Sequence, residues 1–407
     1  MVAGHLREKR GIFHIVLNYS DSAGKRKTKW ISTGLPVKGN KKKAEALLME
    51  ARQKFDPDVN PIADEILFAD YLEEWLEITK HSIQMITYSS YYNMTKGAIA
   101  PYFREREITL KGLLPKDIQG FYAQELGRVK ASTVIHYHAV IRKALQYAVK
   151  TNLIQTNPAD KVERPKMERF TGSFYDSDDI SELFEAAKGS KLELPVMFAA
   201  FYGLRRSEVV GLKWDAIDFT NDTLSIRHTV TVCNIDGKNV TIASDSTKTK
   251  SSMRTLPLVP MFKEKLLAVK AEQEANRKLC GRSYNTEYLG YICVDEMGTR
   301  ISPNYVTAGF ASLLEKNGLR KIRYHDLRHS CASLLLANGV PMKQIQEWLG
   351  HSDFSTTANI YAHLDYNSKV SSANALIEGL KLENILGSTD KTTYNVSPVF
   401  RGDKGEK

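Results

Sequence analysis

The spacing of apolar residues changes twice along this 407-residue chain, and those changes limit the folds it can adopt. Residues 11–20 and 27–35 have the pattern of extended strands, and residues 41–55 place small and apolar side chains at helical spacing. The spacing is helical from residue 64 to about 158, whereas strand-like and helical stretches are mixed from residue 176 onward. The pattern predicts an α+β chain that is mainly helical.

Two proline-containing stretches without apolar periodicity, at residues 55–61 and 159–173, are candidate linkers. A chain of this length suits two or three domains of roughly 100 to 200 residues each. We therefore expect a small sheet domain with one helix, a helical domain and a mixed α/β domain, at residues 1–60, 64–160 and 170–386. Residues 387–407 lack a periodic pattern and are expected to form a flexible tail.

The positive charge of the chain is concentrated at its start. The net charge is +10, and residues 1–55 hold 13 Lys and Arg against 4 Asp and Glu, which places nine of the ten net charges there. A basic segment of this kind is typical of a polyanion-binding domain, although it can also be a solvated surface. The helical stretch adds exposed Lys, Arg and Tyr side chains that can lie against DNA.

The sequence shows no sign of membrane insertion or of a metal site. No apolar run approaches roughly 18 residues, and the first residues lack the apolar segment of a secretion signal, so we expect a cytoplasmic protein with no membrane partner. The four cysteines lie far apart without a C-x-x-C pair, which predicts buried, reduced thiols. We expect no metal and no cofactor, and the absence of a G-x-x-x-x-G-K-[ST] loop argues against ATP use.

Four clusters in the mixed region carry candidate chemistry. In GLRRSEVVGL (203–212), Arg205 and Glu208 share one helical face, an arrangement that is more often only a surface ion pair. STKTKSSMRTLPL (246–258) predicts a Lys-rich turn whose tip can bring an ammonium group to a phosphate or a leaving oxygen, although a solvated hairpin has the same pattern.

The other two clusters contain the histidines and one tyrosine. In YHDLRHSCASLLLANG (324–339), His325 and Arg328 share a helical face, and two cation-capable groups side by side need an anion. His329 is expected to point elsewhere and to be structural. In WLGHSDFSTTANIYAHL (348–364), His351 follows a glycine turn, and Tyr361 lies among Ser, Thr and Asn, where a core position is hard to justify.

Taken in order, G-L-R-x-x-E, a Lys turn, H-x-x-R-H, L-G-H and T-T-x-x-I-Y-x-H resemble the motifs of the tyrosine recombinase and integrase family. The resemblance covers about residues 170–365, and the preceding regions match the family only in layout. It implies that Glu208 supports the site, and it implies active-site roles for Arg205, Lys248, His325, Arg328, His351 and Tyr361. Lys250 is close enough to Lys248 to exchange places with it if the turn differs by one residue.

The resemblance also implies a function and partners. The chain looks like the integrases of phages and conjugative transposons, which integrate and excise mobile elements by cutting and rejoining DNA through a 3′-phosphotyrosine intermediate. Its expected partners are double-stranded DNA at core-type and arm-type sites, three further copies of itself in a tetramer, and an excision accessory protein. The basic sheet domain is expected to bind the arm-type sites, and the helical domain the core-type sites.

Two other functions are compatible with parts of this pattern. A type IB topoisomerase uses similar chemistry, but the basic N-terminal domain argues against it. A DNA-binding regulator that has lost catalysis is disfavoured because all six expected active-site side chains are present. After Tyr361, residues 365–386 have helical apolar spacing, and this segment can dock on a neighbouring subunit or fold back on its own domain.

Overall fold

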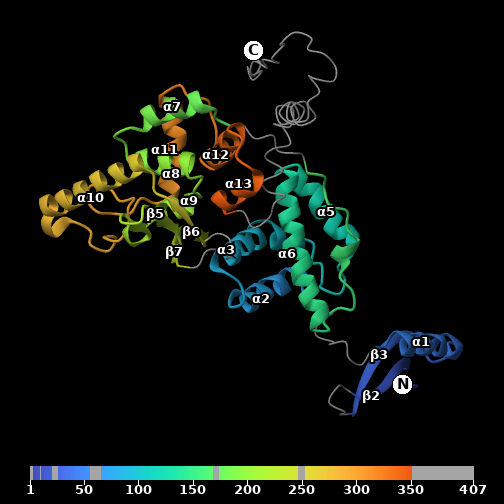
Figure 1. Cartoon of the computed structure of the whole chain (residues 1–407). Coiled ribbons are helices and arrows are strands. Elements are labelled where there is room, and N and C mark those ends of the chain that lie inside the picture. Colours follow the sequence, from blue (N-terminus) through green and yellow to red (C-terminus); the bar gives the residue numbers. More distant parts are fainter. Residues whose placement is uncertain are drawn as a thin grey trace, which may run out of the picture. The chain divides into compact units, whose positions relative to one another are not determined.

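The computed structural model describes residues 3–9, 11–20, 26–55, 66–167, 174–245 and 253–350. Within it the chain divides into two compact units. The first comprises Met1–Phe170 with Val232–Ile242, and the second comprises Thr171–Thr231 with Ala243–Lys407. Helices predominate in both units and the sheets are small, so the predicted α+β class is confirmed (Figure 1).

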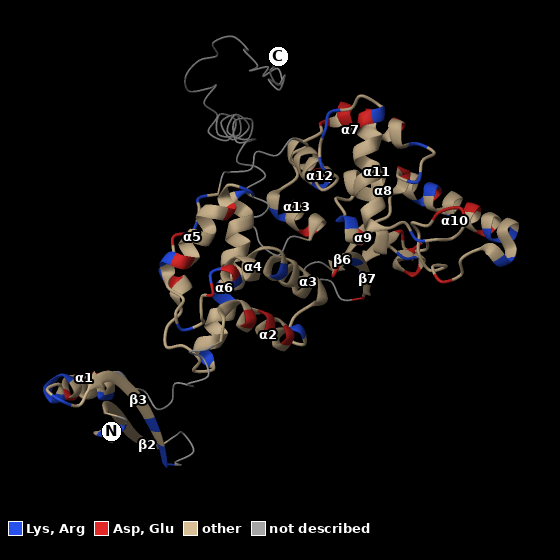
Figure 2. Cartoon of the chain, turned by 180° about the vertical axis from the view of Figure 1, so that it is seen from behind, with Lys and Arg blue, Asp and Glu red and all other residues tan. Residues whose placement is uncertain are grey.

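The basic N-terminal segment forms an antiparallel sheet of β1 (Ala3–Lys9), β2 (Ile12–Ser20) and β3 (Arg26–Pro36), followed by α1 (Lys41–Lys54). Its small core contains Ile15, Val16, Leu17 and Ala44. Lys and Arg residues lie along β3 and on α1 (Figure 2). The two predicted strands and the helix are confirmed, whereas β1 was not foreseen because Leu6 is its only large apolar residue.

The helical part of the first unit packs around a cluster of aromatic rings. Its elements are α2 (Phe68–Lys80), α3 (Met85–Met94), the π-helix η2 (Thr95–Ile99), α4 (Ala100–Glu105), α5 (Pro115–Leu126), α6 (Ala131–Lys150) and the 3₁₀ turn η3 (Pro158–Lys161). Phe121 contacts the rings of Tyr102, Phe103 and Tyr137. The Tyr71 hydroxyl donates to the Ala144 carbonyl oxygen at 2.7 Å, which joins α2 to α6.

The start of α6 differs from the sequence pattern. Ser132 and Thr133 suggest a helix start, but α6 begins at Ala131 and no side chain caps it, so these residues lie in its first turn.

The tip of the β6–β7 hairpin, formed by β6 (Thr229–Ile235) and β7 (Lys238–Ser244), belongs to the first unit. There the side chains of Ser89 and Asn93 in α3 each donate to the Asn234 carbonyl oxygen at 2.8 Å.

The second unit surrounds the buried helix α8 (Glu193–Phe201), which contacts α7 (Ser177–Ala187), α9 (Arg206–Gly211) and α12 (Asp326–Ala337). The other elements are η4 (Trp214–Ala216), β4 (Ile217–Asp218), β5 (Thr223–Ile226), β8 (Arg254–Pro257), α10 (Pro260–Cys280), η6 (Gly281–Ser283), α11 (Pro303–Lys316) and α13 (Met342–Leu349). Strands β4, β5 and β8 form an antiparallel sheet in that order.

Sequence signals account for the start of this unit. The acidic residues before α7 were expected at a helix N-terminus, and the Asp176 carboxylate accepts from the backbone N–H groups of Asp178 and Asp179 at 3.0 and 2.9 Å. All four cysteines are free; Cys233, Cys293 and Cys331 are buried and Cys280 is half-buried. Within the described residues, no helix combines the length and apolar character needed to cross a membrane.

Replacing Phe121 with alanine should lower the free energy of unfolding of the helical part by about 3 to 5 kcal/mol, because it leaves a cavity among the aromatic rings. Native-state hydrogen exchange of α2 and α6 amides in the full chain measures this loss. Leu126→Ala is the matched control, since Leu126 lies on the same helix but is exposed. Equal effects of the two substitutions would contradict this description of the core.

Candidate active site

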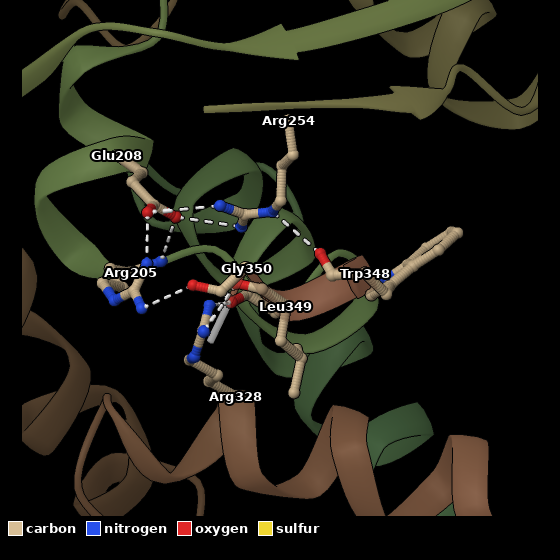
Figure 3. A network of polar contacts seen from close by, with 8 residues as sticks. Arg205, Glu208, Arg254, Arg328, Trp348, Leu349 and Gly350 are labelled. Atoms are coloured by element: carbon tan, nitrogen blue, oxygen red, sulfur yellow. Dashed lines mark hydrogen bonds and ion pairs between the residues drawn. The ribbon is translucent and has the colours of Figure 1, made fainter. Parts of the chain in front are cut away.

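The C-terminal end of α13 is held by three arginines (Figure 3). Gly350 ends this helix with φ +67°, and the last carbonyl groups of a helix lack intrahelical partners and carry its partial negative charge. Three consecutive carbonyl oxygens each accept from a different guanidinium: Trp348 from Arg254 Nε at 2.8 Å, Leu349 from Arg328 Nη2 at 2.6 Å, and Gly350 from Arg205 Nη2 at 3.2 Å. The arginines therefore fix the chain immediately before His351.

The carboxylate of Glu208 lies between two of these arginines and is only 2% exposed. Arg205 Nη1 donates to its Oε1 at 2.7 Å, and Arg254 donates to both oxygens, at 3.3 and 3.1 Å. Burial alone would raise the pKa of this carboxyl, but the charges of Arg254, Arg205 and Arg328 hold the pKa below its ordinary value. Glu208 is therefore ionised at neutral pH, and it is a buried partner rather than half of a surface ion pair.

The cluster has an unbalanced positive charge. Among the residues that the structure describes, Arg205, Arg254 and Arg328 face one carboxylate, that of Glu208, which leaves two positive charges within this described set. Asp326 does not balance them, because Arg323 Nη2 donates to its carboxylate at 2.7 Å. Guanidinium groups match the geometry of phosphate oxygens, so an arrangement of this kind suits a phosphodiester.

Glycine in the G-L-R motif allows this arrangement. Gly203 has φ +62°, and a Cβ built there would lie 2.3 Å from Leu349 Cδ2. Its carbonyl oxygen also accepts from Arg328 Nη1 at 2.6 Å. Any other residue would need the left-handed conformation and would displace the buried Leu349 side chain. Arg205 then precedes α9, and its backbone N–H donates to Glu208 Oε2 at 3.0 Å.

His325 lies at the start of α12; the residue as a whole is exposed, but its imidazole lies against the His329 ring and is neutral at pH 7. Loss of solvation and the charges of His329, Arg328 and Arg205 lower its pKa to about 4. The expectation that His329 points elsewhere is wrong: its ring lies edge-on to His325 with a centroid separation of 5.2 Å, because residues four apart in a helix are neighbours.

The structure brings four of the sequence-predicted residues into one cluster: Arg205, Glu208, His325 and Arg328. Arg328 is 1% exposed, and its two Nη atoms both donate to backbone carbonyls. Lys248, Lys250, His351, Tyr361 and the apolar segment 365–386 lie outside the described residues.

Sequence reasoning missed Arg254. It follows the Lys-rich stretch and resembles one more surface cation, yet its side chain is only 6% exposed. The signal that could have identified it is its position at the start of the strand-like RTLP run, directly after the stretch that contains Lys248.

A second polar cluster that was not foreseen holds the chain three residues before Lys248. His228 Nδ1 and Asp245 Oδ1 are 2.5 Å apart, and His228 Nε2 lies 2.9 Å from the Tyr291 hydroxyl oxygen. Lys213 adds an ion pair to Asp245 at 3.7 Å. These contacts join Asp245, the residue that follows β7, to the body of the second unit.

The His325 pKa can be measured in the free protein by NMR titration of its imidazole, with His325→Gln identifying the signal. We expect a midpoint near 4, since the surroundings favour the neutral ring. The stabilisation of the folded state that comes from the neutral His325 ring is fully present above pH 6.5 and is lost as the pH falls through about 4. A midpoint at the ordinary value of 6.5 would contradict the crowding described above.

Known proteins resemble this chain over most of its length. The model of the phage integrase family matches residues 173–368, and that of the phage integrase N-terminal SAM-like domain matches residues 67–126. A tyrosine recombinase XerC-like protein of Caldanaerobacter subterraneus is 29% identical over 83% of this chain and 89% of its own length. The ICEBs1 integrase of Bacillus subtilis is 24% identical over 84% of this chain and 91% of its own length.

Solved structures share the fold. The Tn1549 transposon integrase in complex with a circular intermediate DNA matches 75% of this chain and 99% of its own, with a TM-score of 0.60 and 16% identity. A lambda integrase dimer bound to a COC' core site matches 87% of this chain and 93% of its own, with a TM-score of 0.52 and 18% identity. Both family models, the relatives and the fold agree, and the chain belongs to the phage integrase family of tyrosine recombinases.

Proposed function

We propose that this recombinase is the integrase of a mobile element and that it cuts DNA with Tyr361 as the nucleophile. The observation that carries the proposal is the arginine cluster around Glu208, whose two net positive charges lie directly before His351. One relative named the ICEBs1 integrase and another named a probable integrase of prophage ps2 support the biological role.

The phosphate is bound through the guanidinium groups of Arg205 and Arg328. The Arg205 side chain is 32% exposed, so it reaches a phosphate while it still contacts Glu208. The Arg328 guanidinium carries five N–H groups, so it can donate to a phosphate oxygen as well as to the Gly203 and Leu349 carbonyls. Donors aimed at the charge that develops on the non-bridging oxygens contribute about 3 to 4 kcal/mol each to the transition state.

The remaining steps are the attack on phosphorus and the proton transfers that accompany it. The Tyr361 hydroxyl oxygen attacks phosphorus, the bond to the 5′-oxygen breaks, and a 3′-phosphotyrosine forms. Neutral His325 accepts a hydrogen bond or the proton from the phenol, whose ordinary pKa near 10 makes it a poor nucleophile at pH 7. Lys248, or Lys250 in its place, protonates the leaving 5′-oxygen, and His351 donates a hydrogen bond to the phosphate. A 5′-hydroxyl of the partner strand then reverses the reaction and rejoins the DNA.

The domains have separate tasks in this proposal. The basic sheet of residues 1–60 binds arm-type sites, residues 64–160 bind core-type sites, and residues 170–386 carry the catalytic side chains. Four copies act on one junction, as in the lambda integrase tetramer bound to a Holliday junction. Residues 365–386 pack on a neighbouring copy or on their own domain, residues 387–407 form a tail, and an excision accessory protein assists in the cytoplasm.

Covalent trapping tests the nucleophile. On duplexes of the element's end sequence that carry a nick next to the cleavage position, wild-type protein should form a covalent DNA adduct, and Tyr361→Phe should form none because it lacks the attacking oxygen. Tyr366→Phe is the matched control, five residues along the chain, and should trap DNA like the wild type. Equal trapping by Tyr361→Phe would defeat the proposal.

Arg205→Lys should leave DNA binding nearly intact and slow cleavage about a hundredfold to a thousandfold, because lysine offers one point charge where the guanidinium offers two aligned donors. Arg206→Lys is the neighbouring control, since the Arg206 side chain donates to the Thr307 hydroxyl oxygen instead of Glu208. Gel-shift binding and single-turnover cleavage separate the two effects. A parallel loss of binding and cleavage would contradict this role for Arg205.

A further inference from the structure

We propose that Arg254 is a positioning residue of the cleavage site, which fixes Glu208 and the end of α13 in the geometry that Arg205 and Arg328 need. This inference rests on the proposed function, because the geometry in question serves phosphate cleavage. It adds a third arginine to the two that the motifs identify, with a different task.

Arg254 differs from Arg328 because it bonds Glu208, and it differs from Arg205 because its side chain is buried. Each of its three side-chain nitrogens donates inward: Nε to the Trp348 carbonyl oxygen, and Nη1 and Nη2 to the two oxygens of Glu208. Its side chain is 6% exposed, whereas that of Arg205 is 32% exposed. Among the bonds between described residues, those of Arg254 are thus directed at Glu208 and at the end of α13, and Arg205 is the more exposed of the two arginines that contact Glu208.

These bonds join three elements that are distant in the sequence. Arg254 is the first residue of β8, Glu208 lies in α9, and Trp348 lies in the last turn of α13. One side chain therefore sets the separation of α9, which presents Arg205, from the helix end that precedes His351 (Figure 3). A displacement of about 1 Å at such a junction can slow a reaction about a hundredfold.

Charge balance gives Arg254 a second effect on Arg205. Glu208 is buried, and an isolated buried carboxylate is costly. With Arg254 bonded to both oxygens, the carboxylate is already balanced, and the charge of Arg205 remains available to a phosphate. Without Arg254, Arg205 becomes the main counter-charge of Glu208, and loss of the Arg254 charge raises the pKa of Glu208 from its lowered value.

The test compares Arg254→Met, Arg254→Lys and a matched control, Arg320→Met. Among the described residues, Arg320 likewise donates to a backbone carbonyl, that of Phe174, and to a carboxylate, that of Asp179, rather than to Glu208. Three quantities are measured for each protein: the rate of adduct formation on the nicked duplex between pH 5 and 8, the affinity for the same DNA, and the melting temperature across the same pH range.

We expect Arg254→Met to bind DNA like the wild type and to form adduct about a hundredfold more slowly. The acid limb of its rate profile and of its melting temperature should move to higher pH, because Glu208 protonates more readily. Arg254→Lys keeps the charge but not the three directed bonds, so it should restore the pH profile and only part of the rate. Arg320→Met should change the melting temperature without moving the pH profile.

Three results would overturn the proposal. The first is adduct formation by Arg254→Met at the wild-type rate, and the second is an acid limb of its rate profile at the same pH as in the wild type. The third is a loss of adduct rate in Arg254→Met no larger than that of Arg320→Met when the two variants have equal melting temperatures. If Arg254→Met does not fold, Arg254→Lys carries the test, and wild-type cleavage by that variant would overturn the proposal. Absence of an adduct from the wild type would instead contradict the proposed function, whereas the pH dependence of melting still tests Arg254.

Discussion

The buried carboxylate of Glu208 is the interaction on which the candidate site depends. A carboxylate that is 2% exposed remains ionised only beside compensating charge, and here Arg205 and Arg254 bond to it directly while Arg328 acts on it through its charge. The same three guanidiniums donate to the last carbonyls of α13. One anion and one helix end therefore hold three cations together that would otherwise repel each other.

This arrangement explains why the site is made of arginines. Each guanidinium has several donors in a fixed plane, so it can bond a carbonyl and still address a second anion. Arg205 and Arg254 each contact Glu208 and one carbonyl of the α13 end at the same time. Lysine could satisfy the charge but not both directions. The excess positive charge that remains is matched to a phosphate, the group that a tyrosine recombinase must bind and cleave.

The sequence predicts much of this site, and the failures have physical causes. The resemblance to the recombinase motifs singled out Arg205, Glu208, His325 and Arg328, and the structure brings these four residues together, while their catalytic roles are part of the proposal. Spacing does not reveal burial, so Glu208 also resembled half of a surface pair and Arg254 resembled a solvated cation. Contacts to the carbonyls of α13 depend on tertiary packing around Gly203, which no local pattern contains. In the fold, β1 was missed because its pairing with β2, and not its own apolar pattern, makes it a strand.

The most direct measurement of the central claim is a structure of the protein on core-site DNA with vanadate in place of the scissile phosphate. The account predicts that Arg205 and Arg328 both donate to vanadate oxygens, that the Tyr361 hydroxyl oxygen lies in line with the leaving 5′-oxygen, and that Glu208 still bonds Arg254. Guanidinium groups too far apart to touch one phosphate, even with Tyr361 supplied by a neighbouring copy, would contradict it.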